Sequence, residues 1–343
     1  MTRPHEAALV PPTDPGWRAF LFQQPSALPY HHPAWVEAVA GTYRFESFVF
    51  VVRSSGGDVL GGVPLVAVGA RLRGKRWVAL PFTDACPAVT DPALTHEEFA
   101  RLLTDEGARA GVSTIELRGP LGASGVPIER GVVHELALTN EDELFAGFES
   151  QVRRNIRKAQ RLDLTLRTAE RVEDLTEIYF GLHAETRRRL GVPTQPRRFF
   201  KNLWEGVLAR DLGFALLVYH GGEPIAGAVF LEWNGRLIYK FGASDARHWS
   251  MRPNNLLFWN AIKGGCERAA KVFDFGRSDL EDEGLRAFKR SWGAVEEPLV
   301  YTALGHPAKS VNGSAERLLK PVLRRSPLWV GRSLGEVFYR YGA

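Results

Sequence analysis

The sequence predicts a mixed α/β fold of two similar domains, each with a β-sheet flanked by helices. Two observations predict it. The same order of elements, three strands followed by a helix and one more strand, occurs once in each half of the chain. Each copy also opens with two apolar runs separated by Gly-Gly, which is the sequence pattern of a β-hairpin.

The elements of the two copies correspond one to one along the chain. Alternating or continuous apolar runs predict the strands, and apolar residues at helical spacing predict the helices. In the first copy the hairpin is predicted at residues 48–68, the third strand at 76–82, the helix at 95–111 and the last strand at 113–120. In the second copy the same elements are predicted at residues 213–233, 236–244, 254–270 and 271–278.

The segments between and after the two copies are predicted to be helical. Residues 140–164 begin with Asn140 as a helix cap and Glu143 three residues later. Residues 172–191 end at Gly191, and Pro193 lies two residues later. The last segment is interrupted at Pro321 and Pro327. These boundaries predict a first domain of residues 1–139, a second domain of residues 140–305 and a helical tail of residues 306–343.

Composition excludes several classes of protein. The chain is 45% hydrophobic and 24% charged, as in ordinary globular domains. It has no apolar run of about 18 residues that would span a bilayer, and its N-terminus is too polar for a signal peptide, so we expect a cytoplasmic protein. Cys86 and Cys266 are too few for a disulfide framework, and the adjacent His31 and His32 lack the spacing of a metal site. We therefore expect no bound metal.

The charge is unevenly distributed. Counting Lys and Arg against Asp and Glu, residues 1–150 hold 12 and 18, a net of −6, and residues 151–343 hold 32 and 21, a net of +11. The second half therefore suits a phosphate-bearing ligand, an anionic membrane face or nucleic acid. A solvated basic surface explains the same count. No aromatic–basic motif of DNA-binding proteins is present, and we expect no DNA partner.

Several segments occur in a characteristic order: "QVRRNIRKAQ", "HAETRRRLGVPTQPRRFF", "MRPNNLLFWNAI", "FDFGRSDLEDEGLRAFKRSWGA" and "SPLWVGRSLGEVFYR". Together they resemble the FemAB-like transferases and the BioF2-like acetyltransferase-domain proteins of the GNAT superfamily. The resemblance implies two tandem GNAT-like domains that transfer an acyl group to an amine. The implied donor is either acetyl-CoA or another acyl-CoA, or an aminoacyl-tRNA, with no tightly bound cofactor. It further implies that the second domain is catalytic, that the first is structural or faces the acceptor, and that the tail packs on the first domain.

Lys289 is the first catalytic candidate. The pair Phe288-Lys289 in "GLRAFKRSWG" matches a Phe-Lys pair of the family. The resemblance implies that Phe288 lies at the transfer site and that Lys289 positions the acyl carbonyl or offsets its developing negative charge. The alternative interpretation is a surface lysine whose methylene groups cover Trp292.

Further candidates lie on two strands of the second copy. Asp274, Arg277 and Ser278 lie at the carboxyl end of a strand, the end that commonly faces ligand in α/β sheets. Asp274 is predicted to be a general base or to orient a cation, and a structural ion pair is the alternative. Tyr239 and Lys240 are adjacent on the central strand and should face opposite ways. We assign Tyr239 to the acceptor or the leaving group, with a half-buried sheet tyrosine as the alternative.

The substrate-binding candidates are basic or polar. Thr186 and Arg189 in "ETRRRLG" resemble a T-x-x-R segment of the family, which implies contact with phosphates of the acceptor. Arg154, on the basic face of one predicted helix, and Arg252, at the start of another, are further candidates for binding phosphate. The glycine-containing segment that binds the pyrophosphate of CoA in GNAT enzymes is replaced here by "RHWSMRPNN", which weakens the case for a conventional CoA site.

Together these features predict an N-acyltransferase that moves an acyl or aminoacyl group to an amine on a cell-envelope glycan, polysaccharide or lipid-linked precursor. One alternative is acetyl-CoA-dependent acetylation of a small amine or amino sugar. The other is a non-catalytic module that binds an anionic membrane face or a partner through its basic half and tail. The partners expected are a phosphate-bearing substrate, tRNA as donor, and the inner face of a membrane through peripheral contact.

Overall fold

The structure is a computed structural model that describes residues 5–70, 74–305 and 320–341. Among these residues the chain divides into two compact units, one holding residues 5–70, 74–131, 298–305 and 340–341 and the other residues 132–297 and 320–339. The division falls within strand β7 (Val126–Ala137), earlier in the chain than the predicted boundary after residue 139.

The first unit has the strand order β1-β2-β3-β4-β6-β13, and the short β5 pairs with β3. Its pairs are antiparallel except for β4 and β6, which run parallel. Trp17, Trp35 and Trp77 are almost completely buried in this unit. Its elements are β1 (Glu6–Val10), α1 (Pro15–Phe22), the 3₁₀ turn η1 (Pro29–His31), α2 (Pro33–Tyr43), β2 (Glu46–Arg53), β3 (Val59–Ala70), β4 (Gly74–Val78), β5 (Val89–Thr90), α3 (His96–Arg109), β6 (Val112–Leu117) and the end of β13 (Val295–Gly305).

The second unit has the strand order β7-β12-β11-β10-β9-β8. Its pairs are antiparallel except for β11 and β12, which run parallel. Its elements are the end of β7, α4 (Glu141–Gly147), α5 (Ser150–Arg161), β8 (Thr165–Thr168), the π-helical segment η2 (Asp174–Tyr179), α6 (Phe180–Leu190), α7 (Arg197–Gly206), η3 (Leu208–Arg210), β9 (Gly213–His220), β10 (Glu223–Trp233), β11 (Arg236–Ser244), η4 (Ala246–Met251), α8 (Pro253–Glu267), β12 (Val272–Ser278), α9 (Glu283–Arg290) and α11 (Leu328–Tyr341).

The repeat predicted from the sequence is confirmed. In each unit three consecutive antiparallel strands lead into a helix and then into a strand that runs parallel to the third. The predicted hairpin glycines lie in turns, with φ angles of 56° at Gly221 and 85° at Gly222, values that favour glycine. The structure extends each copy at its start, where an edge strand (β1 or β8) and a pair of helices precede the hairpin.

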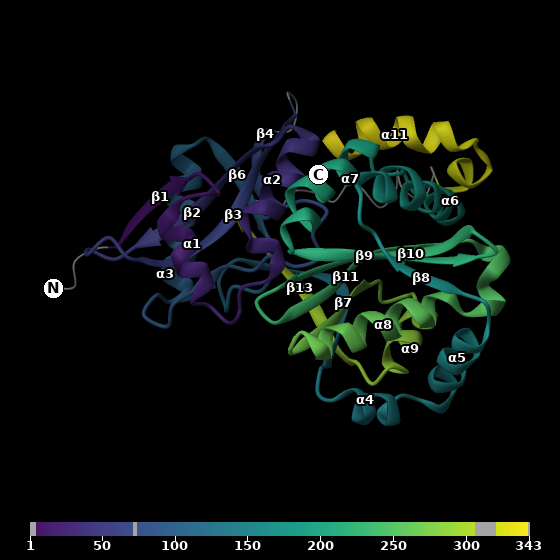
Figure 1. Cartoon of the computed structure of the whole chain (residues 1–343). Helices are drawn as coiled ribbons and strands as arrows, with labels where there is room; N and C mark the ends of the chain where they lie inside the picture. Colours follow the sequence, from purple (N-terminus) through teal and green to yellow (C-terminus); the bar gives the residue numbers. More distant parts are fainter. Residues whose placement is uncertain (1–4, 71–73, 306–319, 342–343) are drawn as a thin grey trace. The chain divides into compact units, whose positions relative to one another are not determined.

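Helices cover both faces of the second unit's sheet (Figure 1). Helices α6 and α7 lie on one face, and α5, α8 and α9 lie on the other. The α8 face holds an aromatic core that includes Phe258, Phe273, Phe275 and Trp292. Phe273 and Phe275 share this face, with their ring centroids 4.6 Å apart.

The predicted helical segments form with local changes. Asn140 caps α4 as predicted, because its side-chain oxygen accepts the Glu143 N–H at 3.0 Å. The chain then breaks at Phe148, which has an extended backbone, so the segment forms two helices. The helix predicted to end at Gly191 does so in a left-handed conformation, with φ of 74°.

The described part of the tail differs from its prediction at Pro321 and in the unit on which α11 packs. Residues 306–319 lie outside the described residues, and Pro321 lies within helical residues 320–325 and does not interrupt them. The predicted interruption at Pro327 is confirmed, because α11 begins at the next residue. Helix α11 packs on the second unit, although the resemblance implied the first domain: Tyr339 accepts a hydrogen bond of 2.6 Å from Arg187, and Gly331 accepts one of 3.1 Å from the Thr194 N–H. Glycines on this face let the helix approach the Thr194 backbone closely.

Candidate active site

Strands β11 and β12 separate partway along their length. They pair in parallel only between residues 236–238 and residues 272–274. Beyond Ile238 and Asp274, no further pairing between them occurs among the described residues, although β11 continues to Ser244 and β12 to Ser278. Parallel strands end at the same edge of a sheet, so the candidates that follow these two residues share that edge.

A β-bulge at Lys240 decides which side chains face which way. Tyr239 pairs with Phe230 and Phe241 with Val229, so Lys240 is an extra residue on β11. As a result Tyr239 packs on Phe258 of α8, at 4.7 Å between ring centroids, and Phe241 packs on Phe199 of α7, at 5.6 Å. Strict alternation would place Tyr239 and Phe241 on the same face.

Tyr239 is half-buried with its hydroxyl directly above Gly242. A Cβ atom at Gly242 would lie 1.6 Å from the Tyr239 hydroxyl oxygen, so only glycine leaves room for this ring. Burial raises the pKa of Tyr239 to about 12. The hydroxyl therefore stays protonated at neutral pH and can donate a hydrogen bond.

Three of the predicted site residues, Asp274, Arg277 and Lys289, meet around Gly276 at the end of β12. Gly276 has a φ angle of 73°, which side chains rarely tolerate. Its N–H donates to Asp274 Oδ1 at 2.7 Å, and its carbonyl oxygen accepts from Lys289 Nζ at 2.6 Å. Lys289 also donates to the Arg277 carbonyl oxygen at 3.1 Å. Asp274 and Lys289 together fix the backbone where β11 and β12 separate.

Lys289 is buried, at 3% exposure, and is therefore not the surface lysine of the alternative interpretation. A buried ammonium group needs partners, because taking it out of water unpaired costs several kcal/mol. The two backbone carbonyls supply such partners.

An ionic cluster that the sequence did not predict lies near Lys289. His134 of β7 is fully buried, with Nε2 3.0 Å from Glu296 Oε2. Burial and then the charge of Lys289 lower the pKa of His134, against the opposing effect of Glu296. Arg286 binds both oxygens of Glu296, at 3.0 and 2.7 Å, and Arg290 binds one at 3.0 Å. These hydrogen bonds and charges lower the pKa of Glu296 to about 2.

The other candidates at this edge have different surroundings. Ser278 is 2% exposed, and its hydroxyl has no hydrogen-bond partner among the described residues. Arg277 is exposed and forms an ion pair with Asp279. Phe288 packs into the aromatic core, with its ring centroid 5.8 Å from that of Phe258. The Phe288 side chain therefore supports α9.

Thr186 and Arg189 converge on the end of β11. The Thr186 hydroxyl accepts the Ser244 N–H at 3.1 Å, and Arg189 Nη1 donates to the Ser244 carbonyl oxygen at 2.9 Å. Thr186 is buried and tied to the strand, whereas Arg189 is half-buried and lies 4.6 Å from the ring centroid of Trp249. Sequence reasoning missed Trp249, although it lies within the segment that replaces the usual glycines.

Arg154 and Arg252 are exposed and stand apart from this group. Arg154 donates to Ser150 and Gln151 of its own helix, at 3.1 and 2.7 Å. Arg252 has a left-handed backbone, with φ of 63°, and directly precedes α8. Neither makes a contact with the residues around Gly276 in the described part of the chain.

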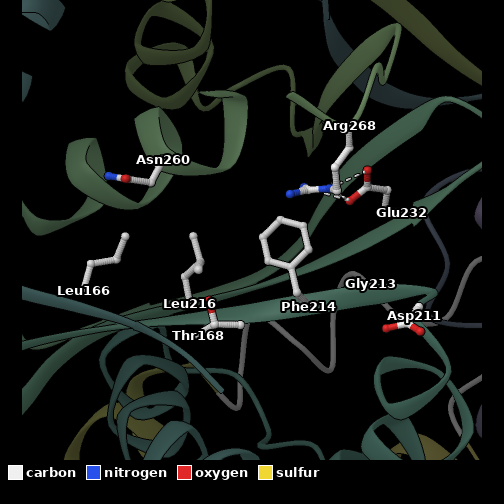
Figure 2. Close-up of a pocket in the computed structure, with 9 residues that line it drawn as sticks. All are labelled: Leu166, Thr168, Asp211, Gly213, Phe214, Leu216, Glu232, Asn260 and Arg268. Carbon is white, nitrogen blue, oxygen red and sulfur yellow. Dashed lines mark hydrogen bonds and ion pairs between the residues drawn. The ribbon is translucent and has the colours of Figure 1, made fainter. Parts of the chain in front are cut away.

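A separate cavity of about 530 Å³ opens beside β8 and β9 (Figure 2). Phe214 lies within it between an ion pair of Arg268 with Glu232 on one side and leucines on the other. None of the predicted site residues lines it. The predicted catalytic residues lie instead near the point where β11 and β12 separate, and we therefore place the candidate site there.

Part of the chain is similar to a known protein family. Residues 146–290 match the acetyltransferase (GNAT) domain family. These residues form a GNAT domain. The FemAB-like resemblance drawn from the sequence is thereby confirmed. The matched GNAT domain contains every predicted site residue, from Arg154 to Lys289.

Curated relatives match a shorter part of the chain. A lipid II:glycine glycyltransferase of Staphylococcus haemolyticus is 32% identical over 89 residues, which are 24% of this chain and 21% of the relative. The enzyme of the same name from Staphylococcus aureus is 29% identical over 92 residues, which are 25% and 22%. The match thus spans about a fifth of the length of these relatives.

Solved structures share the fold over most of the chain. The crystal structure of FemX has a TM-score of 0.67 at 16% identity and covers 86% of this chain and 96% of its own. L-PGS from Bacillus licheniformis has a TM-score of 0.57 at 12% identity, with 92% and 99% covered. A tandem GNAT protein of the clavulanic acid pathway has 0.51 at 13%, with 89% and 100% covered. These likenesses confirm the predicted mixed α/β fold of tandem GNAT type.

Proposed function

We propose that this protein transfers an acyl or aminoacyl group to an amine, with the reacting groups where β11 and β12 separate. The observation that carries the proposal is the end of pairing at Ile238 and Asp274 within the GNAT domain. Past this point β11 has a sheet partner on its β10 side alone among the described residues. Its other edge therefore has backbone groups available to an extended donor.

The reaction joins the amine nitrogen to the acyl carbon. The amine lone pair attacks the carbonyl, the bond from the acyl carbon to the donor's oxygen or sulfur breaks, and the proton that the amine loses passes to the departing oxygen or sulfur. Tyr239 is suited to donate a hydrogen bond to the departing oxygen or sulfur, because its hydroxyl lies on β11 beside the point where β11 and β12 separate and is protonated at neutral pH. Lys289 and Asp274 act on Gly276, and their role is to hold the backbone beside the reacting carbonyl.

Charge and the names of the relatives support one class of acceptor. The second half of the chain carries a net charge of +11 by the count above, which favours a phosphate-bearing acceptor. The curated relatives act, by name, on lipid II. We therefore propose an amine on a lipid-linked cell-envelope precursor, modified by a cytoplasmic enzyme. No helix among the described residues is long and apolar enough to cross a bilayer.

The test is transfer of a radiolabelled group by the purified full-length chain. Labelled acetyl-CoA and labelled glycyl-tRNA are offered separately with lipid II as acceptor, and Tyr239→Phe is compared with the wild type. We expect transfer from one donor and a fall in kcat/KM of about 10²-fold in the variant. Tyr219→Phe, a half-buried sheet tyrosine on β9, is the matched control and should keep full activity. Absence of transfer from both donors, or full activity in Tyr239→Phe, would refute the proposal.

A further inference from the structure

The cavity beside β8 and β9 has an apolar floor. Leu166, Phe214 and Leu216 line it, and Leu216 is buried. Figure 2 shows the Phe214 ring in the middle of the cavity, with the two leucines on one side of it. The volume of about 530 Å³ lies in the range of small-molecule sites, which are mostly apolar with a few placed polar groups. The cavity is therefore large enough for a ligand with an apolar body.

The wall of the cavity is held in place by packing and by an ion pair. The Phe214 ring stacks on that of Phe230 at 5.1 Å between centroids, and Phe230 is completely buried. The guanidinium of Arg268 lies 4.8 Å from the Phe214 ring centroid. Arg268 Nε donates to both carboxylate oxygens of Glu232, at 2.9 and 2.8 Å. A ligand thus meets a wall that is already formed, and little free energy is needed to order it.

The cavity offers a ligand more hydrogen-bond acceptors than donors. Arg268 is the only cation among the lining residues that the structure describes, and Glu232 offsets its charge. Asp211 adds a carboxylate that forms no ion pair or hydrogen bond within the described residues. The Asn260 amide nitrogen donates to the Leu256 carbonyl oxygen at 2.8 Å, which leaves the amide oxygen as an acceptor. One arginine against two acids gives the lining a net charge of −1.

Asp211 lies across Phe214 from the leucines. Figure 2 shows the carboxylate of Asp211 on one side of the ring, and Leu166 and Leu216 on the other. All four residues line the same cavity. A ligand that lies across the Phe214 ring can therefore place an apolar end near the leucines and a charged end near Asp211.

We propose that this cavity binds an amine that carries an apolar ring. The ring packs on Phe214, and the ammonium group donates to the Asp211 carboxylate. Charge decides the class. A carboxylate ligand would be repelled by Asp211, and the arginine that could bind it already binds Glu232. The site goes beyond the proposed acyl transfer, because none of the residues assigned to that reaction lines the cavity.

The test is a titration of the full-length chain, followed by ligand-observed NMR, with three probes of similar shape: tryptamine, tryptophol and indole-3-acetate. At neutral pH they carry an ammonium group, a hydroxyl and a carboxylate on the same ring system. We expect tryptamine to bind about threefold to tenfold more tightly than tryptophol, the range that a charge-assisted contact supplies at a partly exposed site. Indole-3-acetate should bind most weakly.

Two variants locate the binding. Asp211→Asn suits the left-handed backbone at this position, where φ is 57°, and should abolish the preference for tryptamine over tryptophol. Asp142→Asn, at an exposed acid of α4 outside the cavity, is its control and should keep the preference. Thr168→Trp fills the cavity from the edge strand β8 and should abolish binding of all three probes. Thr165→Trp, on the same strand but outside the lining, is its control and should bind as the wild type does.

Three results would overturn the inference: tryptamine that binds no more tightly than indole-3-acetate, a preference for tryptamine that survives in Asp211→Asn, or equal binding to Thr168→Trp and to the wild type. Acyl transfer is measured separately. A chain that binds tryptamine as expected but transfers no acyl group would refute the proposed function and leave this site standing. A chain that transfers the group but binds no amine in the cavity would do the reverse.

Discussion

Asp274 and Lys289 bind opposite sides of one residue. Asp274 Oδ1 accepts the N–H of Gly276 at 2.7 Å, and Lys289 Nζ donates to the carbonyl oxygen of the same residue at 2.6 Å. Gly276 has a φ angle of 73°, so a carboxylate and an ammonium group together hold a turn that most residues cannot adopt. The turn follows the last residue at which β12 pairs with β11.

Replacing Lys289 by methionine should destabilise the protein. The substitution keeps an unbranched apolar chain but removes the donor for the buried Gly276 carbonyl oxygen and the part-buried Arg277 carbonyl oxygen, and an unsatisfied buried group costs about 1–3 kcal/mol. We expect the free energy of unfolding in urea to fall by about 2 kcal/mol or more. Lys263→Met on the surface of α8 is the control and should change it by less than about 0.5 kcal/mol. Unchanged stability in Lys289→Met would show that the turn forms without the ammonium.

Replacing Gly242 by alanine should displace Tyr239. The new Cβ would lie 1.6 Å from the tyrosine hydroxyl oxygen, and overpacking of this kind costs about 1–3 kcal/mol. Because Tyr239→Phe removes the clashing oxygen, the double variant should lose less stability than the sum of the two single variants. A double-mutant cycle from urea unfolding measures this coupling. Gly69→Ala in β3 is the control, since a Cβ there meets nothing within 4 Å. Additive effects at Gly242 and Tyr239 would contradict the predicted contact.

Glu296 should make stability depend on acid pH. Its folded-state pKa is about 2, below the ordinary value of 4.5, because Arg286 donates hydrogen bonds to it. A depressed folded pKa contributes stability that is fully present above pH 4.5 and is lost as the pH falls towards 2. Glu296→Gln should therefore lower Tm most at neutral pH, and the difference from wild type should shrink between pH 4.5 and 2.

Calorimetry of the wild type and Glu296→Gln across this range measures the effect. Glu297→Gln is the control, because Glu297 has no comparable ion cluster among the described residues. The difference in Tm between this variant and the wild type should stay nearly constant between pH 4.5 and 2. A Tm difference for Glu296→Gln that does not change with pH would contradict the assignment of the ion cluster to folding stability.

Helix α11 should loosen when Gly335 becomes alanine. A Cβ there would lie 1.8 Å from the Thr194 carbonyl oxygen, which no local adjustment of a side chain relieves. The helix must shift, and the hydrogen bond from the Thr194 N–H to the Gly331 carbonyl should weaken. Hydrogen exchange at the Thr194 amide should speed up. In Gly181→Ala, on α6, a Cβ meets nothing within 4 Å, so this exchange should stay unchanged. Equal exchange in wild type and Gly335→Ala would contradict close packing of α11.

Local patterns in the sequence predicted elements well and contacts poorly. The Gly-Gly hairpins and the Asn140 cap depend on neighbouring residues, and both were confirmed. The sequence pointed to Lys289 and Asp274 as candidates, but it did not predict that both side chains form hydrogen bonds with the backbone of Gly276. His134 and Glu296 lie on strands far apart in the chain, and no local pattern links them.

By itself the sequence determined the repeated α/β architecture, the family resemblance and the charge asymmetry, because periodicity, turn residues and composition are properties of short segments. Tertiary structure alone decided where those segments act on one another. The bulge at Lys240 turned Tyr239 towards α8, the folded turn buried Lys289, and the end of β11 brought Arg189 to Trp249. These outcomes depend on register and packing between distant elements, whose energies no single segment of the chain encodes.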